Sequence, residues 1–404
     1  MEVRKDKEII DRILNKGVEQ ILPSKEALRE LLESDKRIRI YQGFDPTADT
    51  LHIGHTVGMR KLEDFRKLGH HVIFLVGDFT ARIGDPSDKT AARQMLTKEQ
   101  VEENMKLYKE QASNIIDMDN KENPVEVLYN SQWLEPLNFN DIIHLASKFT
   151  VQQMIKRDMF QRRLETNKPI YISEFMYPIM QGYDCVMMNV DVEVGGNDQL
   201  FNMLAGRDLI MSELNKEKIV LAGKLLETSD GSKMGKSEGN MIKMNDTPEE
   251  IFGKVMAFTD DQIVDAFELL TSADLDEIDE IKKRFESDEN PMKLKKELAF
   301  RITSELKTEK EAKIAEEYFE TVFQNKSIET ELKEVTVKEK EYNILELITE
   351  VELAPSKSQA RRLVEQNAVS IDDEKIDDWQ MSITITKPIV IKVGKNILKI
   401  TQDN

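Results

Sequence analysis

The first half of the chain alternates between continuous apolar runs and amphipathic stretches. Residues 37–44 (RIRIYQGF) predict an entering strand followed by a loop, and residues 71–79 (HVIFLVGDF) contain a continuous apolar run, typical of a strand buried on both faces of a parallel sheet. Between them, residues 55–70 place apolar side chains at helical spacing and end in a glycine-containing turn. This order predicts a βαβ unit. With further strands expected in residues 124–130 and 218–226, the first half predicts a doubly wound α/β domain.

The pattern changes to helices alone between residues 247 and 325. Thr247 is a helix cap, Pro248 suits the first turn, and Glu250 completes a capping box. Residues 290–302 begin another helix in the same way. We therefore expect an all-α domain to follow the α/β domain.

The C-terminal part combines one helix with short strands. Residues 326–342 are polar and charge-rich, which predicts a linker. Residues 356–372 indicate a helix and a turn, and residues 381–400 alternate with a period of two, as antiparallel strands do. The predicted boundaries are 1–227 for the α/β domain, 228–246 for a lysine loop and linker, 247–325 for the all-α domain, 326–342 for a second linker and 343–404 for a small α+β domain.

Composition narrows the class of protein. The 404 residues are 40% hydrophobic and 33% charged, and no run approaches the roughly 20 apolar residues of a membrane helix. The charged N-terminus is unlike a secretory signal. One cysteine, Cys185, excludes an internal disulfide framework and fits a reducing compartment. The net charge of −19 argues against nonspecific nucleic-acid binding, although a local basic groove remains open.

Metal and nucleophile chemistry find little support. Among five histidines, His52 and His55 lack a second His/Cys pair, so we expect no metal site. Cys185 lies in an apolar run and is expected in the core. No Ser-His-Asp or Cys-His arrangement is supported.

Two segments instead suit polyphosphate. No GxGxxG motif follows the first strand, and in GSKMGKS only three residues separate Gly231 from Gly235, so this is not a P-loop. The segment still offers Lys233 and Lys236 to a polyphosphate. A solvated lysine turn is the alternative.

The second segment is HIGH, residues 52–55, which follows a strand and opens a helix. Helix N-termini bind phosphate through unpaired N–H groups. Gly54 lets a nucleotide approach the backbone, and His52 and His55 can donate hydrogen bonds. A helix-capping histidine is the alternative, but HIGH together with KMGKS is much more specific than either alone.

The stretches YQGFDPTADTLHIGH, IGDPSDK, YPIMQGYD, VGGNDQ and KMGKS resemble class I aminoacyl-tRNA synthetases, and among these the bacterial tyrosyl-tRNA synthetases, over nearly the whole chain. The resemblance implies a Rossmann-like catalytic domain with an inserted dimer and acceptor-stem region at about 120–190, a helical anticodon-side domain and a small ribosomal-protein-like RNA-binding domain. It implies a cytoplasmic homodimer that activates tyrosine with ATP and charges tRNA(Tyr). Mg²⁺ is expected to arrive with ATP, with no permanently bound metal.

The resemblance also assigns site residues. Contacts to ATP, pyrophosphate and the transition state fall to Thr47, His52, His55, Lys89, Arg93, Lys233, Lys236 and Ser237. Tyrosine binding falls to Tyr41, Tyr177, Gln181, Asp184 and Gln199, with Tyr41 and Asp184 at the phenol and Tyr177 and Gln181 at the α-amino group. Adenylate contacts fall to Gly43, Asp45, Gly54, Gly195 and Asp198, and Gln199 is expected to border this region as well.

Spacing agrees with one part of this assignment. Tyr177, Gln181 and Asp184 lie at i, i+4 and i+7, on one face of a helix, although polar residues capping a core helix are the alternative. Glu193 stands where many relatives carry glutamine, and its role is left open. The loop reads KMGKS rather than KMSKS, but both lysines and Ser237 are present.

Although the net charge of the chain is negative, two local segments are basic enough to bind nucleic acid. Residues 148–168 contain six basic and two acidic side chains, and a further basic stretch lies near residue 360. The expected tRNA contacts are Lys156, Arg157, Arg162, Arg163, Lys357, Arg361 and Arg362. Ordinary solvated faces are the alternative, and the neighbouring IDDEKIDD is acidic. The competing functions are a tryptophanyl relative, disfavoured by Tyr41 with Asp184, and a non-catalytic RNA-binding paralogue, disfavoured by the intact nucleotide motifs.

Overall fold

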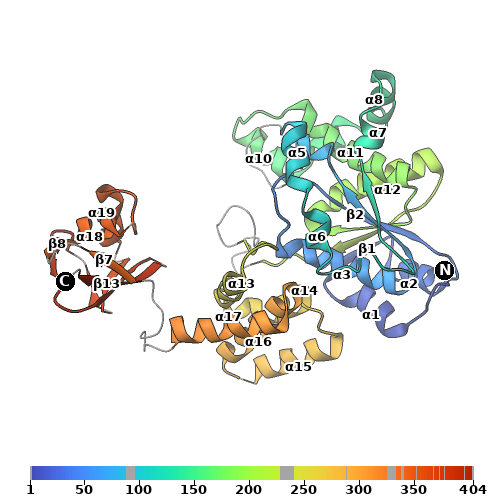
Figure 1. The fold of residues 1–404 in the computed structure, drawn as a ribbon. Coiled ribbons are helices and arrows are strands. Elements are labelled where there is room, and N and C mark those ends of the chain that lie inside the picture. The colour runs from blue at the N-terminus through green and yellow to red at the C-terminus, as the bar shows by residue number, and fades with distance from the viewer. Residues whose placement is uncertain are drawn as a thin grey trace. The chain divides into compact units, whose positions relative to one another are not determined.

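The structure is a computed structural model in which the chain forms two compact units, Met1–Phe319 and Glu320–Asn404 (Figure 1). It describes residues 2–87, 96–227, 241–287, 289–324, 334–337, 341–351, 353–366, 368–372, 374–376, 378–394 and 396–402. Among these residues, no helix combines the length and the apolar character that crossing a bilayer requires.

The first unit is built on a six-stranded sheet with the order β1-β6-β5-β2-β3-β4. The strands are β1 (Val18–Leu22), β2 (Arg39–Phe44), β3 (His71–Val76), β4 (Glu126–Tyr129), β5 (Val192–Gly196) and β6 (Ile219–Gly223). Strands β2 to β6 are parallel, which confirms the predicted doubly wound sheet, whereas β1 is an antiparallel edge strand that the sequence pattern did not predict. The chain leaves β2 toward β3 and later returns to β5 on its other side, so the topological switch point lies between β2 and β5.

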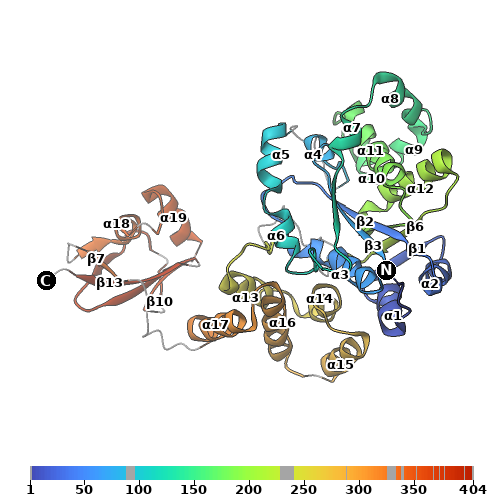
Figure 2. The same cartoon turned by 45° about the vertical axis from the view of Figure 1, so that its right-hand side comes forward.

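Helices cover both faces of this sheet. In Figures 1 and 2, α3 lies on one side, and α11 and α12 lie on the other. The helices of this part are α1 (Lys7–Asn15), α2 (Lys25–Glu33), α3 (Ile53–Lys67), α4 (Thr80–Ile83), α5 (Lys98–Met105), α6 (Tyr108–Ala112), α7 (Ser131–Leu134), α8 (Phe139–Ala146), α9 (Val151–Ile155), α10 (Asp158–Glu165), α11 (Ile172–Met188), η1 (Asn197–Gln199) and α12 (Leu200–Leu214).

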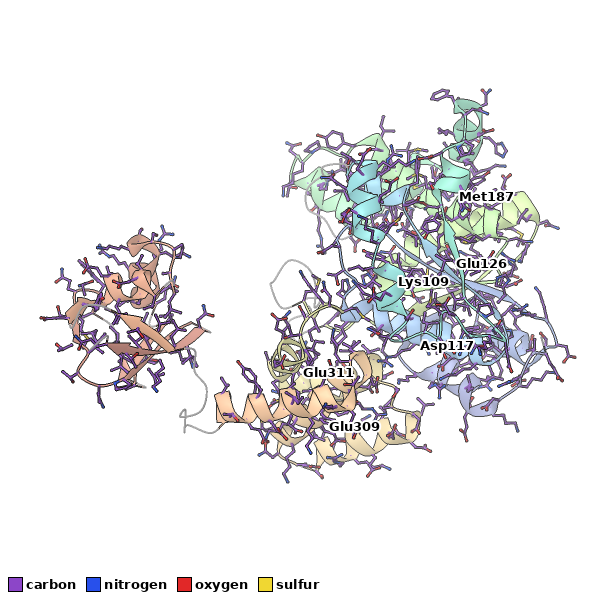
Figure 3. All side chains as sticks on the ribbon, viewed as in Figure 1. Lys109, Asp117, Glu126, Met187, Glu309 and Glu311 are labelled. Atoms are coloured by element: carbon purple, nitrogen blue, oxygen red, sulfur yellow. The ribbon has the colours of Figure 1, made fainter. Side chains whose placement is uncertain are left out.

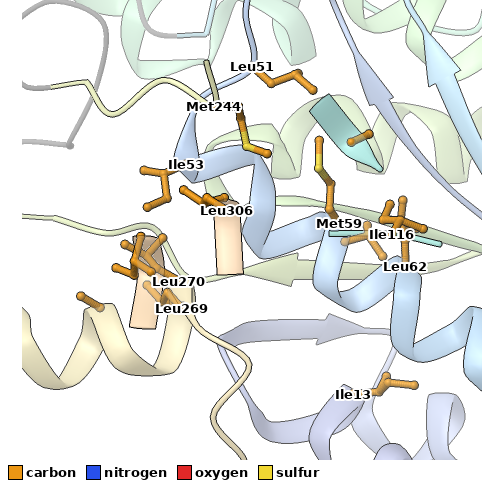
Figure 4. Packing of buried hydrophobic residues seen from close by; sticks show 14 of the residues in the cluster. Ile13, Leu51, Ile53, Met59, Leu62, Ile116, Met244, Leu269, Leu270 and Leu306 are labelled. Atoms are coloured by element: carbon orange, nitrogen blue, oxygen red, sulfur yellow. The ribbon is translucent and has the colours of Figure 1, made fainter. Parts of the chain in front are cut away.

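The predicted helical region follows as α13 (Pro248–Met256), η2 (Asp260–Gln262), α14 (Ile263–Leu270), α15 (Leu275–Glu286), α16 (Pro291–Leu306) and α17 (Glu309–Phe319), with the π-helical turn η3 (Glu320–Gln324) at the start of the second unit. The predicted capping box is present, since Thr247 N donates to Glu250 Oε2 at 2.9 Å. Leu269 of α14 and Leu306 of α16 join Ile53 and Met59 of α3 in one apolar cluster (Figure 4). The helical region and the α/β region therefore share a core within one unit.

The second unit combines two small sheets with two helices. Its elements are β7 (Glu334–Val337), β8 (Glu341–Asn343), α18 (Ile344–Glu350), α19 (Lys357–Glu365), β9 (Val369–Ile371), β10 (Glu374–Lys375), β11 (Ser382–Thr384), β12 (Ile389–Val393) and β13 (Asn396–Gln402). The expected α+β character and antiparallel strands are present. The predicted linker 326–342 is wrong at 334–337 and 341–342, which are strands. Charged neighbours hid the alternation of β7, whose Val335 and Val337 pack into this unit's core.

Candidate active site

The predicted site residues gather at the switch point between β2 and β5. Tyr41 and Gly43 lie on β2, and Gly195 lies on the adjacent β5. Asp198 and Gln199 form η1 directly after β5. Ligands of open parallel sheets bind outside the carboxyl ends of the strands at such a point. The fold thus brings together residues that are more than 150 positions apart in the sequence.

The HIGH segment forms the start of α3. His55 Nδ1 accepts a hydrogen bond from the backbone N–H of His52 at 3.1 Å, and the two rings stack with centroids 3.8 Å apart. The backbone donor therefore fixes the neutral His55 ring with its proton on Nε2, which makes Nε2 a donor. A Cβ at Gly54 would lie 3.0 Å from the His52 ring, so glycine lets that ring fold across the first turn. The helix-capping role and the donor role hold together.

A cavity of about 50 Å³ lies beside this helix start. Gly54 lines it from α3, and Gly195 and Gly196 line it from β5, with Leu225 nearby. Bare glycine backbone allows a flat ligand to approach closely. The structure therefore places the predicted adenylate residues Gly54 and Gly195 around one space.

The segment that follows the lysine loop is hydrogen-bonded to the HIGH segment. Ile53 N donates to Ile242 O at 2.9 Å, and Met244 N donates to Leu51 O at 2.9 Å. Residues 228–240, with Lys233, Lys236 and Ser237, lie outside the described residues, as do residues 88–95, with Lys89 and Arg93. The described end of the lysine segment is nonetheless fixed beside HIGH.

Asp184 is the most buried carboxylate of the predicted tyrosine pocket. It is 2% exposed on α11, and its two oxygens accept separately from Trp133 Nε1 at 2.7 Å and from Asn130 Nδ2 at 3.2 Å. Burial raises the pKa of Asp184 well above its ordinary value, because these two donors do not replace the lost water. A buried acceptor of this kind gains strongly from a further hydrogen-bond donor.

Tyr177 connects the same pocket to Asp45. Its hydroxyl donates to Asp45 Oδ2 at 2.8 Å, and Thr80 Oγ1 donates to Asp45 Oδ1 at 2.7 Å. Asn130 Nδ2 in turn donates to Thr80 Oγ1 at 3.0 Å as well as to Asp184. One network thus joins Asp45, Tyr177 and Asp184, three residues that the sequence predicted, through two that it missed.

Tyr41 points to Glu193 and not to Asp184. The Tyr41 hydroxyl donates to Glu193 Oε1 at 2.6 Å, and Gln181 Nε2 donates to the same oxygen at 3.0 Å. Lys218 forms an ion pair with the other oxygen of Glu193. The role of Glu193 was left open from the sequence. In the structure, its carboxylate orients Tyr41 and Gln181 by accepting a hydrogen bond from each. Cys185 is buried as expected, but its Sγ lies 3.0 Å from the Tyr41 hydroxyl.

Asp85 is a site residue that sequence reasoning missed. Gln199 Nε2 donates to Asp85 Oδ2 at 2.5 Å, and Asn202 Nδ2 donates to Gln199 Oε1 at 2.9 Å. The quoted stretch IGDPSDK contained the signal, because an Asp-Pro-Ser turn follows a predicted strand. Thr80, Asn130, Trp133 and Lys218 carried no spacing signal, since they meet only through the fold.

The predicted tRNA residues differ in exposure. Lys156 and Arg162 are exposed, whereas Arg157 is half-buried, with Nη2 donating to Ser87 Oγ at 2.6 Å. Arg163 is 1% exposed and forms a buried ion pair with Glu174. The expectation of an RNA contact is therefore wrong for Arg163, whose guanidinium holds the start of α11 to α10.

The basic residues of α19 stay at the surface of the second unit. Lys357 pairs with Glu346 at 2.7 Å, and the Arg361 guanidinium lies 4.3 Å from the centre of the Trp379 ring. Arg362 is exposed beside them. All three side chains therefore lie at the surface of this unit. Within the described residues, no group of three or more His, Cys, Asp or Glu side chains is arranged to hold a metal ion.

Comparisons with known proteins agree with this geometry. Residues 33–324 match the family model of class I tRNA synthetases (W and Y), and residues 324–396 match the tyrosine–tRNA ligase SYY-like C-terminal domain. The chain is 43% identical over 386 residues to the tyrosine–tRNA ligase of Thermotoga maritima, covering 95% of each chain. It is 41% identical over 384 residues to that of Legionella pneumophila, covering 95% of this chain and 94% of the relative.

Solved structures share the fold at lower identity. A C-terminally truncated mitochondrial tyrosyl-tRNA synthetase of Aspergillus nidulans aligns with a TM-score of 0.66 at 20% identity, over 79% of this chain and 95% of that one. The tyrosyl-tRNA synthetase of Archaeoglobus fulgidus, solved with L-tyrosine, aligns with a TM-score of 0.59 at 21% identity, over 76% and 99%. At this identity, the alignments show that the chain has the same fold as these proteins.

Proposed function

The chain belongs to the class I tRNA synthetases of the tryptophan and tyrosine type, and we propose that it is a tyrosine–tRNA ligase. It activates tyrosine with ATP, giving tyrosyl-adenylate and pyrophosphate, and then transfers the tyrosyl group to the 3′ end of tRNA(Tyr). The curated relatives named above carry this activity in their names. The observation that carries the proposal is the buried carboxylate of Asp184, which accepts hydrogen bonds from Trp133 and Asn130.

The phenol of tyrosine is the substrate group that Asp184 suits. The substrate hydroxyl donates to the carboxylate, which is buried and accepts, within the described residues, from Trp133 and Asn130. Phenylalanine offers no donor and would leave the buried acceptor without its third partner. Tyrosyl-tRNA synthetases are the established example of such discrimination, at about 10⁵-fold against phenylalanine.

The α-amino group lies at the Tyr177 end of the pocket. Burial raises the pKa of Tyr177 well above its ordinary value, and the nearby carboxylates of Asp45 and Asp85 add to the shift. Two carboxylates flanking a neutral hydroxyl attract an ammonium group. With Tyr177 and Gln181, they hold the amino acid so that its carboxylate faces the HIGH segment.

ATP then occupies the space between HIGH and β5. Nε2 of His55, the His52 ring and the positive N-terminal end of α3 meet its phosphates. A carboxylate oxygen of tyrosine attacks the α-phosphorus while the bond to pyrophosphate breaks. Position and charge stabilisation, rather than a protein base, drive such a step. In the second step, a ribose hydroxyl of the tRNA attacks the tyrosyl carbonyl and AMP leaves.

Cations complete this arrangement. Lys233, Lys236 and Ser237 clamp the pyrophosphate, a role supported by the hydrogen bonds of Ile242 and Met244 to the backbone around HIGH. Lys89 and Arg93 add positive charge, and Thr47, in the turn after β2, contacts a phosphate. Mg²⁺ enters as part of the Mg·ATP substrate, coordinated by phosphate oxygens. Gly43, Asp45, Asp198 and Gln199 border the ribose and the α-phosphate.

Partners are proposed from the surface. Large apolar side chains are exposed on α8, α11 and α12, and Figure 3 labels Met187 among them. These exposed side chains are Phe139 and Ile143 on α8, Ile172 and Met187 on α11, and Met211 and Leu214 on α12. A second copy of the chain covers this surface in a homodimer. Lys156, Arg157, Arg162, Lys357, Arg361 and Arg362 contact tRNA(Tyr), and the enzyme acts in the cytoplasm, where its one cysteine stays reduced.

Amino-acid-dependent exchange of labelled pyrophosphate into ATP tests the proposal, with tyrosine, tryptophan and phenylalanine supplied separately. Exchange with tyrosine alone is the expected result. Exchange with tryptophan would keep the fold and overturn the roles of Tyr41 and Asp184. Absence of exchange from folded protein would favour a non-catalytic RNA-binding role instead.

A further inference from the structure

A buried ion pair between Glu193 and Lys218 lies next to Tyr41. Glu193 on β5 is 2% exposed, and Lys218, which precedes β6, is fully buried. Lys218 Nζ donates to Glu193 Oε2, to Met203 O at 2.9 Å and to Cys185 Sγ at 3.2 Å, so its three N–H bonds each have a partner. Although burial opposes the charge, Cys185 and Glu193 raise the pKa of Lys218 above its ordinary value. The lysine is therefore an ammonium group inside the protein.

The backbone makes room for this pair. A Cβ at Gly206 of α12 would lie 2.6 Å from Lys218 Nζ and 2.7 Å from Cys185 Sγ, so any larger residue there would displace the pair. Buried ion pairs rarely stabilise a fold more than apolar side chains of the same volume, because desolvation offsets their attraction. A glycine that accommodates one beside a substrate pocket therefore indicates a role in the pocket.

The hydrogen bonds around the pair form a ring, and the direction of the bond between Tyr41 and Glu193 is fixed. Glu193 accepts only, so the Tyr41 hydroxyl, at 2.6 Å, donates its single proton to it. The Cys185 thiol, whose pKa burial raises to about 12, keeps its proton, and its Sγ lies 3.0 Å from the Tyr41 oxygen, 3.4 Å from Glu193 Oε2 and 3.5 Å from Gln181 O. Lys218 donates to both Cys185 and Glu193 and closes the ring.

This direction fixes what the pocket offers to a substrate. The Tyr41 hydroxyl donates its hydrogen bond to Glu193, so its oxygen can only accept a hydrogen bond from a substrate. Asp184 also accepts hydrogen bonds, from Trp133 and Asn130 on its two oxygens. We propose that the Glu193–Lys218 pair is a specificity-determining positioning element, which holds the Tyr41 proton away from the substrate and makes the para position of the pocket accept hydrogen bonds only. The inference rests on tyrosine being the substrate.

The consequence concerns the donors of the para substituent. Tyrosine brings one O–H to two acceptors, whereas 4-aminophenylalanine brings two N–H bonds. Phenylalanine and 4-fluorophenylalanine bring none. Each hydrogen bond to a charged acceptor changes an equilibrium by about 10- to 100-fold. The wild-type protein should thus activate 4-aminophenylalanine at least about 10-fold better than 4-fluorophenylalanine, although both substituents are small.

Pyrophosphate exchange at pH 7.5 with these four amino acids tests the proposal, using kcat/KM ratios. In a Glu193→Leu/Lys218→Met variant, Tyr41 loses its acceptor and turns its proton toward the substrate. The tyrosine-to-phenylalanine and the 4-amino-to-4-fluoro ratios should then fall about 10-fold or more. In a Tyr41→Phe background, the same double substitution should leave both ratios unchanged, because the pair acts through Tyr41.

If the pair had a structural role alone, the double substitution would lower kcat/KM for all four amino acids together. It would do so in the Tyr41→Phe background as well. The control removes the exposed Lys109–Asp119 pair with Lys109→Met/Asp119→Leu and should keep the wild-type ratios (Figure 3 labels Lys109). Equal wild-type rates with 4-amino- and 4-fluorophenylalanine would overturn the proposal even if the variant did not fold. If the variant exchanges pyrophosphate with tyrosine and its ratios are unchanged, the role of the Glu193–Lys218 pair is overturned and the proposed function stands. If the wild-type protein shows no exchange with tyrosine, the proposed function is overturned as well.

Discussion

Replacing Asp184 by asparagine should lower the preference for tyrosine over phenylalanine more than it lowers stability. The carboxylate oxygens accept from Trp133 and Asn130 separately, at 2.7 and 3.2 Å. An asparagine has one oxygen, and its amide nitrogen must face either one of these donors or the substrate hydroxyl. Either choice replaces an acceptor by a donor inside a pocket from which water is excluded.

The magnitude follows from these bonds. A hydrogen bond to a charged group contributes about 1.5–3 kcal/mol, against about 0.5–1.5 kcal/mol for a neutral pair. In the wild type, bound phenylalanine leaves the Asp184 carboxylate without a third donor, and the substitution removes this penalty. The kcat/KM for phenylalanine should therefore fall less than that for tyrosine. Together these effects amount to about 2–4 kcal/mol, so the tyrosine-to-phenylalanine ratio of kcat/KM should fall by about 30- to 1,000-fold.

Pyrophosphate exchange with both amino acids measures this ratio directly. Asp158→Asn on α10 is the matched control, because it makes the same chemical change at an exposed carboxylate and should keep the wild-type ratio. Melting curves of both variants show whether the fold survives. If Asp184→Asn slowed exchange equally with tyrosine and phenylalanine, Asp184 would not contact the phenol.

Three further predictions concern other parts of the molecule. Lys236→Ala should slow adenylate formation far more than it weakens tyrosine binding, and equal losses in a single-turnover and a binding assay would contradict the pyrophosphate clamp. Ending the chain after Phe319, where the first unit ends, should preserve pyrophosphate exchange and reduce tRNA charging, and unchanged charging would show the second unit to be dispensable. Burial lowers the pKa of Lys61 to about 7, so between pH 7 and 8.5 the unfolded state binds more protons than the folded state. The free energy of unfolding should therefore rise by about 1.5 kcal/mol over this range, and urea titrations of Lys61→Met should show a correspondingly smaller rise.

The sheet could be predicted from the sequence because buried parallel strands are continuous apolar runs. Residues 72–76 are such a run and lie in the buried strand β3, whereas β2 alternates apolar with polar residues and was predicted as the strand that enters the βαβ unit. The edge strand β1 was missed because its pairing partner, β6, lies about 200 residues later. β7 was missed because its valines are interrupted by charges and are buried only by the rest of its unit.

The site shows the same division. Motifs named the residues that we propose to contact the ligands, since they form contiguous stretches such as HIGH. The residues that support them come from other strands and loops. Asn130 and Trp133 orient Asp184, and Lys218 and Glu193 orient Tyr41, but nothing in their spacing relates them to these partners. Exposure was equally hidden, since Arg163 looks like any other basic residue until the fold pairs it with Glu174.

The nucleotide site is also the place where the helical region joins the sheet. Met244 O, two residues beyond the hydrogen bond between Ile242 and HIGH, accepts from Lys307 Nζ at 3.0 Å, just after α16. Met244, Leu51 and Ile53 pack in the core that α14 and α16 share with α3 (Figure 4). A displacement of α16 would therefore reach the start of α3 through one hydrogen bond and a continuous apolar cluster. Packed interiors transmit such shifts because they have little free volume. The helical region thus supports the proposed ATP site, besides any contact it makes with tRNA.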